Sequence, residues 1–463
     1  MRLIYLAILM LLLISCEQQM VKVYLTTGDK QKLLNEEFLL NNNTDASASG
    51  VMITLDSTQK LQSVDGFGAA LTGSAAYLIN RRLNNQQRDS LLNTLFAPAG
   101  IGISYLRVTM GASDFSLRDF TYNDMPAGQT DPLLSNFSIE PDREDLIPVL
   151  KKIIAINPSI KIMATPWSAP AWMKTNQSLK GGELQPEYYA SYANYFVKYI
   201  KAYEAEGIPI AAVTPQNEPL HHVANYPCMS MSAAQQLDFV KNHLGPAFQA
   251  DGITTGIMLY DHNWDNTEYA ISILNDTDVK KFVVGTAFHA YAGSVSAMGT
   301  VHQAHPDKAL YFTEISGGRW ATNFSDNLMW NLENIFIGTM NNWSKNALLW
   351  NLALDQEDGP TNNGCDNCRG VVTIDNVTGA VTKNEEFYAL AHFSKFVKPG
   401  AFRISNAELH TQQFHYVAFV NPDGSKAMIA SNNDQKPFAF SVKEGANQFS
   451  YTIPAKAVVT LVW

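Results

Sequence analysis

The segment AAVTPQNEP, residues 211–219, joins a short apolar run to a polar cluster that contains Glu218. A second segment, ALYFTEISGG at residues 309–318, has the same form and places Glu314 after an apolar run. Strands of a parallel sheet are covered on both faces, so they read as continuous apolar stretches. Because α/β barrels keep their chemistry at the C-terminal ends of such strands, the two segments predict a barrel with both glutamates on one rim.

Six further apolar runs, most of which end in polar or aromatic residues, extend this pattern along the chain. They are VDGFGAAL near residue 66, ISYLRV ending near Arg107, KIMATPW ending at Trp167, TGIMLYDH ending at His262, KFVVGTAFHAY ending at Tyr291 and ALLWNLAL around Trp350. Helix-like stretches lie between them, for example at 86–95, 187–204 and 232–247. A doubly wound sheet would share this strand–helix alternation. Functional side chains on so many consecutive strand ends favour an α/β fold of the (β/α)8 TIM-barrel type.

The composition changes after about residue 395, where Gly, Ser and Asn become more frequent and segments such as HYVAFV alternate apolar with polar residues. Such alternation is typical of antiparallel strands with one buried face. The strand-like VMITL near the other chain end can join them, so we expect an accessory antiparallel β-sandwich domain formed by both chain ends. The predicted divisions are a signal peptide at 1–15, a tether with strands at 16–62, the barrel at 63–394 and the C-terminal sandwich at 395–463.

The N-terminus has the features of an export signal. Arg2 precedes an uninterrupted apolar run to Ile14, which is too short to span a bilayer as a helix. The run ends in Leu-Ile-Ser-Cys16, which resembles the lipobox of bacterial lipoproteins and implies lipidation of Cys16. We therefore expect an exported, lipid-anchored bacterial lipoprotein at the cell surface or in the periplasm. A plain secretory signal with an incidental Cys16 is the alternative.

Three further cysteines remain in a chain that is expected to be exported to an oxidising compartment. Cys365 and Cys368 form a C-x-x-C pair in a Gly/Asn-rich loop, which favours a local disulfide over two free thiols. Because neither a second Cys pair nor a His pair has ligand spacing to this pair, a zinc site is not expected. Cys228 is left over and is expected to be buried.

The charge balance limits the possible partners. The chain has 33 basic and 43 acidic residues, a net charge of −10, and shows no cluster of Lys and Arg. Nucleic acid is therefore not an expected partner. No cofactor and no metal ion are predicted, and the oligomeric state is left open.

Two carboxyl groups on one rim suit the cleavage of a glycosidic bond. A retaining glycosidase needs them roughly 5–5.5 Å apart, with one as acid/base and the other as nucleophile. Asn217 directly precedes Glu218, and its amide can donate to the sugar 2-hydroxyl. This neighbour favours Glu218 as the acid/base and Glu314 as the nucleophile. A structural ion pair is the alternative for either carboxylate.

Several motifs together resemble the family 30 glycoside hydrolases. They are VDGFGAALTGSAA, YLRVTMGASDFS, MATPWSAPAWMKTN, TPQNEP, GTAFHAY, FTEISGG and LLWNLALDQEDGP, and the similarity runs from about residue 50 to the C-terminus. The resemblance implies a (β/α)8 barrel with a β-sandwich built from both chain ends, and a retaining mechanism. It assigns Glu218 as acid/base and Glu314 as nucleophile. It also implies that the substrate site is lined by Arg107, Trp167, Asn217, Tyr226, His289, Tyr291 and Trp350.

Within this family, two positions differ from the glucosylceramidases. Gly73 stands where they carry an Asp in the first loop, and Ala290 stands where they carry a Trp between the His and Tyr of the sixth strand. The loop DGPTNNGCDNCRGVVTID resembles the endo-β-1,6-glucanase branch instead. The resulting hypothesis is a retaining endo-β-1,6-glucanase whose partner is a β-linked glucan. The alternatives are an exo-acting β-glucosidase or β-xylosidase, a glucosylceramidase-like enzyme, and a non-catalytic glycan-binding surface lipoprotein.

Overall fold

The computed structural model describes residues 20–40, 51–406 and 413–463. The expected signal peptide at 1–15 and the lipidation site at Cys16 lie outside these residues. Within the described ranges, no helix is long and apolar enough to cross a membrane.

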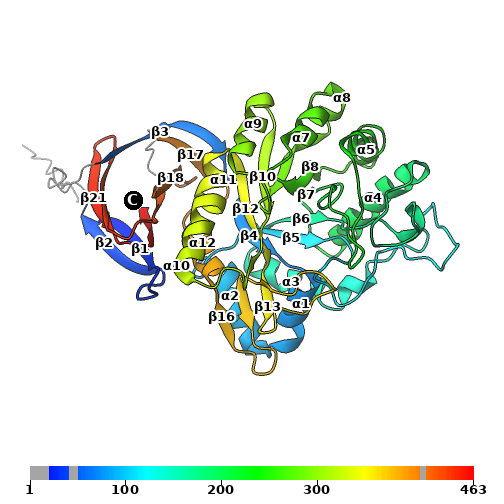
Figure 1. The fold of residues 1–463 in the computed structure, drawn as a ribbon, viewed down its shortest axis with the longest axis horizontal. Helices are drawn as coiled ribbons and strands as arrows, with labels where there is room; N and C mark the ends of the chain where they lie inside the picture. Colours follow the sequence, from blue (N-terminus) through cyan, green and yellow to red (C-terminus); the bar gives the residue numbers. More distant parts are fainter. Residues whose placement is uncertain (1–19, 41–50, 407–412) are drawn as a thin grey trace, which may run out of the picture.

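Eight parallel strands close into a barrel, which confirms the predicted fold class (Figure 1). Each strand coincides with one of the eight apolar runs picked out in the sequence. Around the barrel they follow the order β10-β12-β4-β5-β6-β7-β8-β9. Their bounds are β4 Gly66–Ala70, β5 Tyr105–Thr109, β6 Lys161–Thr165, β7 Ala212–Val213, β8 Gly256–Asn263, β9 Val283–His289, β10 Ala309–Glu314 and β12 Ser344–Asn351.

Helices follow each barrel strand and cover the outside of the barrel (Figure 1). Helix α4 shows why they form there, because its tyrosines and Phe196 are buried on one side while its lysines face outward. The helices are α1 Gly73–Tyr77, α2 Asn85–Phe96, α3 Leu146–Ile156, α4 Tyr189–Ala205, α5 Ala233–Phe239, α6 Gly245–Ala250, α7 Thr267–Leu274, α8 Thr277–Lys280, α9 Ser296–Ala304, α10 Phe324–Trp330, α11 Ile337–Asn341 and α12 Glu385–Ser394.

The barrel interior is built in layers. A buried apolar layer takes one side chain from each of seven strands: Tyr105, Met163, Ala212, Met258, Ala287, Tyr311 and Leu348. Side chains two positions further along a strand point to the same side. This alternation brings Arg107, Thr165, Thr214, His289, Thr313 and Trp350 into a second, mostly polar layer at the C-terminal end of the barrel. The apolar layer therefore closes the floor of a polar site.

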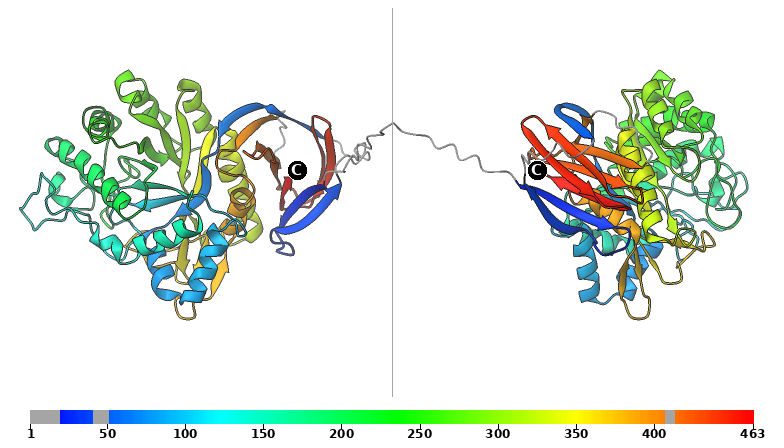
Figure 2. Two further views of the ribbon diagram at one scale, coloured as in Figure 1. Left: turned by 180° about the vertical axis from the view of Figure 1, so that it is seen from behind. Right: turned by 60° about the vertical axis from the view of Figure 1, so that its left-hand side comes forward.

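The second domain is a nine-stranded sheet in the order β2-β1-β22-β19-β18-β17-β3-β20-β21, folded around its own apolar core (Figure 2). Strands from both chain ends join it, as predicted. One expectation was wrong in detail, because β3 and β20 pair in parallel. They come from opposite chain ends, so no hairpin imposes an antiparallel direction. The strands are β1 Met20–Thr27, β2 Asn35–Leu40, β3 Met52–Ser63, β17 Phe402–Asn406, β18 Phe414–Val420, β19 Lys426–Asn432, β20 Phe438–Glu444, β21 Asn447–Ile453 and β22 Ala457–Val462.

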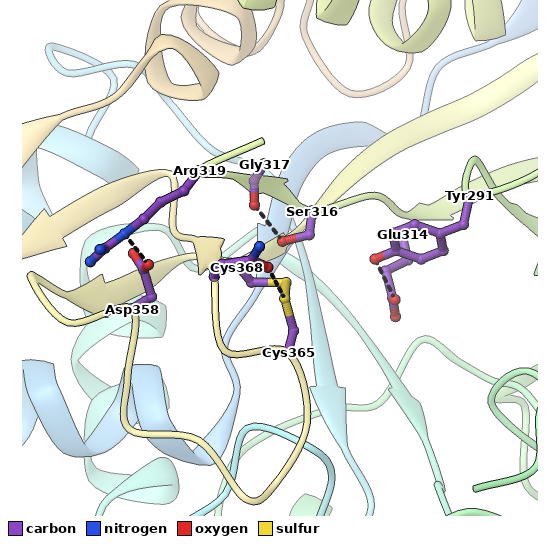
Figure 3. Close-up of a disulfide and its surroundings, with 9 residues drawn as sticks. Tyr291, Glu314, Ser316, Gly317, Arg319, Asp358, Cys365 and Cys368 are labelled. Carbon is purple, nitrogen blue, oxygen red and sulfur yellow. Dashed lines mark hydrogen bonds and ion pairs between the residues drawn. A yellow bond between two sulfur atoms is a disulfide. The ribbon is translucent and has the colours of Figure 1, made fainter. Parts of the chain in front are cut away.

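Short strands extend the C-terminal rim of the barrel. They are β11 Gly317–Gly318, β13 Ala353–Asp355, β14 Cys368–Arg369, β15 Val372–Ile374 and β16 Val381–Lys383. Strand β11 begins three residues after Glu314, the last residue of β10, and pairs antiparallel with β14. A disulfide joins Cys365 to Cys368 at the start of β14 (Figure 3), and Cys228 is a buried free thiol. The rim is therefore ordered by backbone pairing right beside the predicted nucleophile.

Candidate active site

Arg107 organises the polar layer from the middle of β5. Its side chain is fully buried and makes ion pairs with Glu314 and with Asp261, 2.8 Å away. The same guanidinium donates to Oδ1 of Asn217 at 2.8 Å. Because this contact uses the carboxamide oxygen, the amide NH2 group of Asn217 remains for a ligand. One buried cation thus orients residues from three strand ends.

Asp261 reaches this layer through an irregularity in β8. The pairing register with β9 shifts between Tyr260 and His262, and both Tyr260 and Asp261 have positive φ, at 69° and 63°. The bulge turns Asp261 inward, where it accepts from His289 at 3.0 Å and from Thr313 at 2.6 Å. Bulges of this kind are common next to active sites because they redirect a side chain.

Glu218 and Glu314 face each other across the rim. One carboxylate oxygen of each, together with a ring nitrogen of His289, forms a group whose atoms all lie within 4.8 Å of one another. Glu218 has a positive φ of 42°, and its N–H donates to the Asp261 carbonyl at 2.9 Å. Such strained backbone at a non-glycine residue is typical of functional sites. The carboxylate spacing fits the short separation that a retaining glycosidase requires.

Each glutamate has its own set of partners. The Tyr291 hydroxyl donates to Oε1 of Glu314 at 2.9 Å (Figure 3), and Arg107 contacts the other oxygen of this carboxylate. Glu218 instead contacts Nδ1 of His289 at 3.1 Å. Glu314 is therefore held by an arginine that stays charged, while Glu218 is held by a histidine that can exchange a proton.

Aromatic side chains form one wall of the site. Trp167 and Trp350 stack with ring centroids 5.1 Å apart, and the Arg107 guanidinium lies 4.9 Å from the Trp167 ring. Behind them lies a buried cluster that includes Phe115 and Cys368. Tyr226 packs against this cluster from the loop after Glu218, so the structure brings both glutamates and all seven residues predicted to line the substrate site to one rim.

Glu218, His289 and Glu314 also have the spacing of metal ligands. Their donor atoms, however, are engaged with one another and with Arg107, Asp261 and Tyr291. Since Arg107 already supplies a buried positive charge there, we assign these residues to acid–base and nucleophilic chemistry.

Comparisons with known proteins agree with this geometry. The model of the glycosyl hydrolase family 30 TIM-barrel domain matches residues 64–397, and that of the family 30 β-sandwich domain matches residues 400–461. The chain belongs to glycoside hydrolase family 30. It is an O-glycoside hydrolase on the evidence of both domains.

Three relatives of this family 30 hydrolase show how closely it is related to proteins of known activity. It is 35% identical to an endo-1,6-β-D-glucanase of Neurospora crassa, over 90% of this chain and 89% of that protein. It is 30% identical to the lysosomal acid glucosylceramidase of Mus musculus, over 90% of this chain and 84% of that protein. The solved structure of endo-β1,6-glucanase BT3312 is 37% identical, with a TM-score of 0.89, over 96% of this chain and 99% of that one.

Asp261 and Asp114 belong to the site but were not predicted as site residues from the sequence. Asp114 follows β5, and its Oδ1 is buried without a hydrogen-bond partner among the described residues. Burial and the charges of Glu314 and Glu218 raise the pKa of Asp114 well above its usual value. Gly364 packs directly on Asp114, so the disulfide loop covers it. Gly73, which stands where the glucosylceramidases carry an Asp, is the first residue of α1 and contributes no side chain to the site. Asp114 lies in the segment ASDF shortly after a predicted barrel strand, and this position near a strand end is what could have indicated it from the sequence.

The buried charges of the hydrolase perturb one another. Burial lowers the pKa of His289, but the charges of Glu314 and Asp261 outweigh it and raise this pKa to about 9. Burial raises the pKa of Glu314, and the positive charges of His289 and Arg107 limit that rise. For Glu218, burial raises the pKa, but the hydrogen bond and charge of His289 outweigh it and hold the pKa below its usual value. At neutral pH the proton of the contact between His289 and Glu218 therefore lies on His289, beside an ionised Glu218.

Proposed function

We propose that this family 30 hydrolase is a retaining endo-β-1,6-glucanase. The observation that carries the mechanism is the approach of the Glu218 and Glu314 carboxylates to within 4.8 Å on one rim. The substrate class is supported by relatives named as endo-1,6-β-D-glucanases, which align over most of this chain. Ala290 and the disulfide loop support this branch over a glucosylceramidase-like enzyme.

In the first step, an ionised oxygen of Glu314 attacks the anomeric carbon and the glycosidic C–O bond breaks. His289 passes its Nδ1 proton to Glu218 across their 3.1 Å contact, and Glu218 delivers a proton to the leaving oxygen. The free NH2 group of Asn217 donates to the sugar 2-hydroxyl, a contact that strengthens as the oxocarbenium-like transition state forms. The product of this step is a glycosyl ester on Glu314.

In the second step, Glu218 acts as a base. Esterification removes the negative charge of Glu314. Glu218 then accepts a proton from a water molecule that attacks the same carbon, and the ester C–O bond breaks, which releases the sugar and restores the Glu314 carboxylate. Two inversions return the β configuration. Asp114 and the Trp167–Trp350 wall bind the sugar, because a buried carboxyl group and aromatic faces suit its hydroxyls and its apolar ring face.

Incubation with a panel of β-glucans tests this proposal. We expect release of short β-1,6-linked oligosaccharides from β-1,6-glucan and little from β-1,3-glucan, β-1,4-glucan or xylan. Proton NMR of the first product should show the β anomer, and Glu314→Gln should abolish turnover at an unchanged fold. Release of only glucose from chain ends would refute endo action, and an α anomer appearing first would refute the retaining mechanism. Binding of the glucan by the unmodified protein without cleavage would favour a glycan-binding lipoprotein.

We also propose that the protein is exported and anchored to a membrane through lipidated Cys16, because a short apolar run leads into a lipobox-like sequence. Expression in a bacterial host followed by detergent phase partition tests this. The unmodified protein should enter the detergent phase and Cys16→Ser the aqueous phase. Equal partition of the two proteins would contradict the anchor.

A further inference from the structure

A second cavity opens directly beside the catalytic pair. It has a volume of about 690 Å³, within the range of small-ligand sites. Tyr291 and Ile315 line it on the side of Glu314, to which Tyr291 donates a hydrogen bond. Residues 320–323 and the face of α10 line the opposite side. The cavity therefore borders the catalytic rim at Tyr291.

The cavity carries exposed aromatic rings. Trp320, Trp330 and Tyr291 are 56%, 42% and 45% exposed, although side chains of this size usually bury more of their surface. An exposed aromatic cluster inside a concave surface marks an interaction site. Aromatic faces bind the apolar face of a pyranose ring, as the Trp167–Trp350 wall is placed to do in the catalytic site itself.

The position of Trp320 depends on the rim architecture. A Cβ added at Gly318 would lie 2.0 Å from the Trp320 ring, so the indole lies directly on the backbone of β11. Strand β11 pairs with β14 at Cys368, and Figure 3 shows the disulfide close to Ser316 and Gly317. The indole is thus placed by a short paired strand rather than by a free loop, which makes it a preorganised platform.

Polar groups surround the aromatic platform. Thr322, Asn323 and Asp326 line the cavity together with the edges of Asn327 and Asn331. The Asp326 side chain is 66% exposed, and its Oδ1 accepts from Lys456 at 3.4 Å, so its Oδ2 is the oxygen that can accept from hydroxyl groups. Ala290 lines the same cavity, and its small side chain leaves the space next to Tyr291 open. Aromatic faces with hydroxyl-binding groups at their edge match a neutral sugar.

We propose that this cavity binds a further glucosyl residue of the same β-1,6-glucan chain, at least one sugar away from the bond that is cleaved. The inference builds on the proposed endo-β-1,6-glucanase activity. Trp320 and Trp330 supply the stacking faces, and one chain occupies both sites by passing Tyr291, which lines the cavity and contacts Glu314. The cavity gives long chains an affinity that short substrates lack, because short substrates reach only the catalytic rim.

Trp320→Ala and Trp330→Ala test the inference, with Phe38→Ala as a matched control. Phe38 is 55% exposed on β2 of the other domain. Each Trp variant should raise KM for polymeric β-1,6-glucan by about tenfold, the effect of losing one well-packed aromatic contact. The kinetic constants for an aryl β-glucoside should stay unchanged. The control should match the unmodified protein on both substrates.

Binding gives a second readout that does not depend on turnover. In the Glu314→Gln background, titration calorimetry with β-1,6-linked oligosaccharides should show affinity rising with chain length, and Trp320→Ala should remove that rise. If the unmodified protein cleaves β-1,6-glucan but the Trp variants keep its KM and its dependence on chain length, the second binding site is refuted while the proposed function stands. If the unmodified protein does not cleave β-1,6-glucan, the proposed function fails and this inference with it.

Discussion

Replacing Asp261 by Asn tests the electrostatic logic of the site. Asp261 pairs with Arg107 at 2.8 Å and with Nε2 of His289 at 3.0 Å, and all three side chains are fully buried. Asn removes the negative charge at nearly constant volume. Breaking a buried ion pair in this way costs about 3–5 kcal/mol of unfolding free energy. The same change removes one of the two charges that raise the pKa of His289.

The His289 pKa turns this substitution into a pH-dependent prediction. The folded pKa is about 9, and the unfolded value is about 6.5. Since the folded pKa is the higher, the stabilisation is fully present below pH 6.5 and is lost as the pH rises through 9. The difference of about 2.5 pH units corresponds to about 3 kcal/mol. In Asp261→Asn the His289 pKa falls, so less stability is lost between these two pH values.

Activity should follow the same group, because His289 stores the proton that Glu218 delivers. We expect the alkaline limb of kcat/KM on β-1,6-glucan near pH 9 in the unmodified enzyme, and at lower pH in Asp261→Asn. Urea unfolding at pH 6 and 9.5 gives the stability difference, and circular dichroism checks the fold. Asp251→Asn, which removes a surface pair with Lys201, serves as the matched control. A folded Asp261→Asn variant with an unshifted alkaline limb would refute the reasoning.

Three further predictions concern single contacts. Tyr291→Phe removes the hydroxyl that binds Glu314 and should lower kcat by about 10- to 100-fold with little change in KM, and an unchanged kcat would contradict this role. Replacing both Cys365 and Cys368 by Ser should lower the unfolding free energy by no more than about 2 kcal/mol, because the closed loop is short, yet raise KM by loosening β14. Equal KM values would count against that coupling. Burial lowers the pKa of His392 to about 3, so stability should fall by about 2–3 kcal/mol between pH 6.5 and 4.5. Urea unfolding of His392→Gln should show a smaller fall, and an equal fall would exclude His392 as the cause.

Much of the barrel could be predicted because burial on both faces forces continuous apolar strands. The alternation within them also determines the active-site layer. Tyr311 lies in the apolar floor, so Thr313 points inward two positions later, and Leu348 predicts Trp350 by the same rule. Strand-end position therefore placed most of the proposed site residues on the inner rim. The parallel pairing of β3 with β20 escaped prediction because neighbours from opposite chain ends carry no turn signal.

The residues that were missed share a different cause. By alternation from Met258, the inward position on β8 belongs to Tyr260, and only the bulge at Tyr260–Asp261 gives it to Asp261. Neither residue is a glycine, so the sequence contains no marker of the positive φ values. Trp320 likewise depends on the pairing of two-residue strands, which have no periodicity to detect. The ends of the apolar strands thus point to both glutamates in the sequence, whereas the residues that set the pH dependence and the proposed chain-length preference depend on tertiary irregularities that leave no such signal. Substitutions at Asp261 and Trp320 should therefore have different effects. Replacing Asp261 should change kcat/KM and its pH profile for substrates of every chain length, whereas replacing Trp320 should change only the preference for long chains.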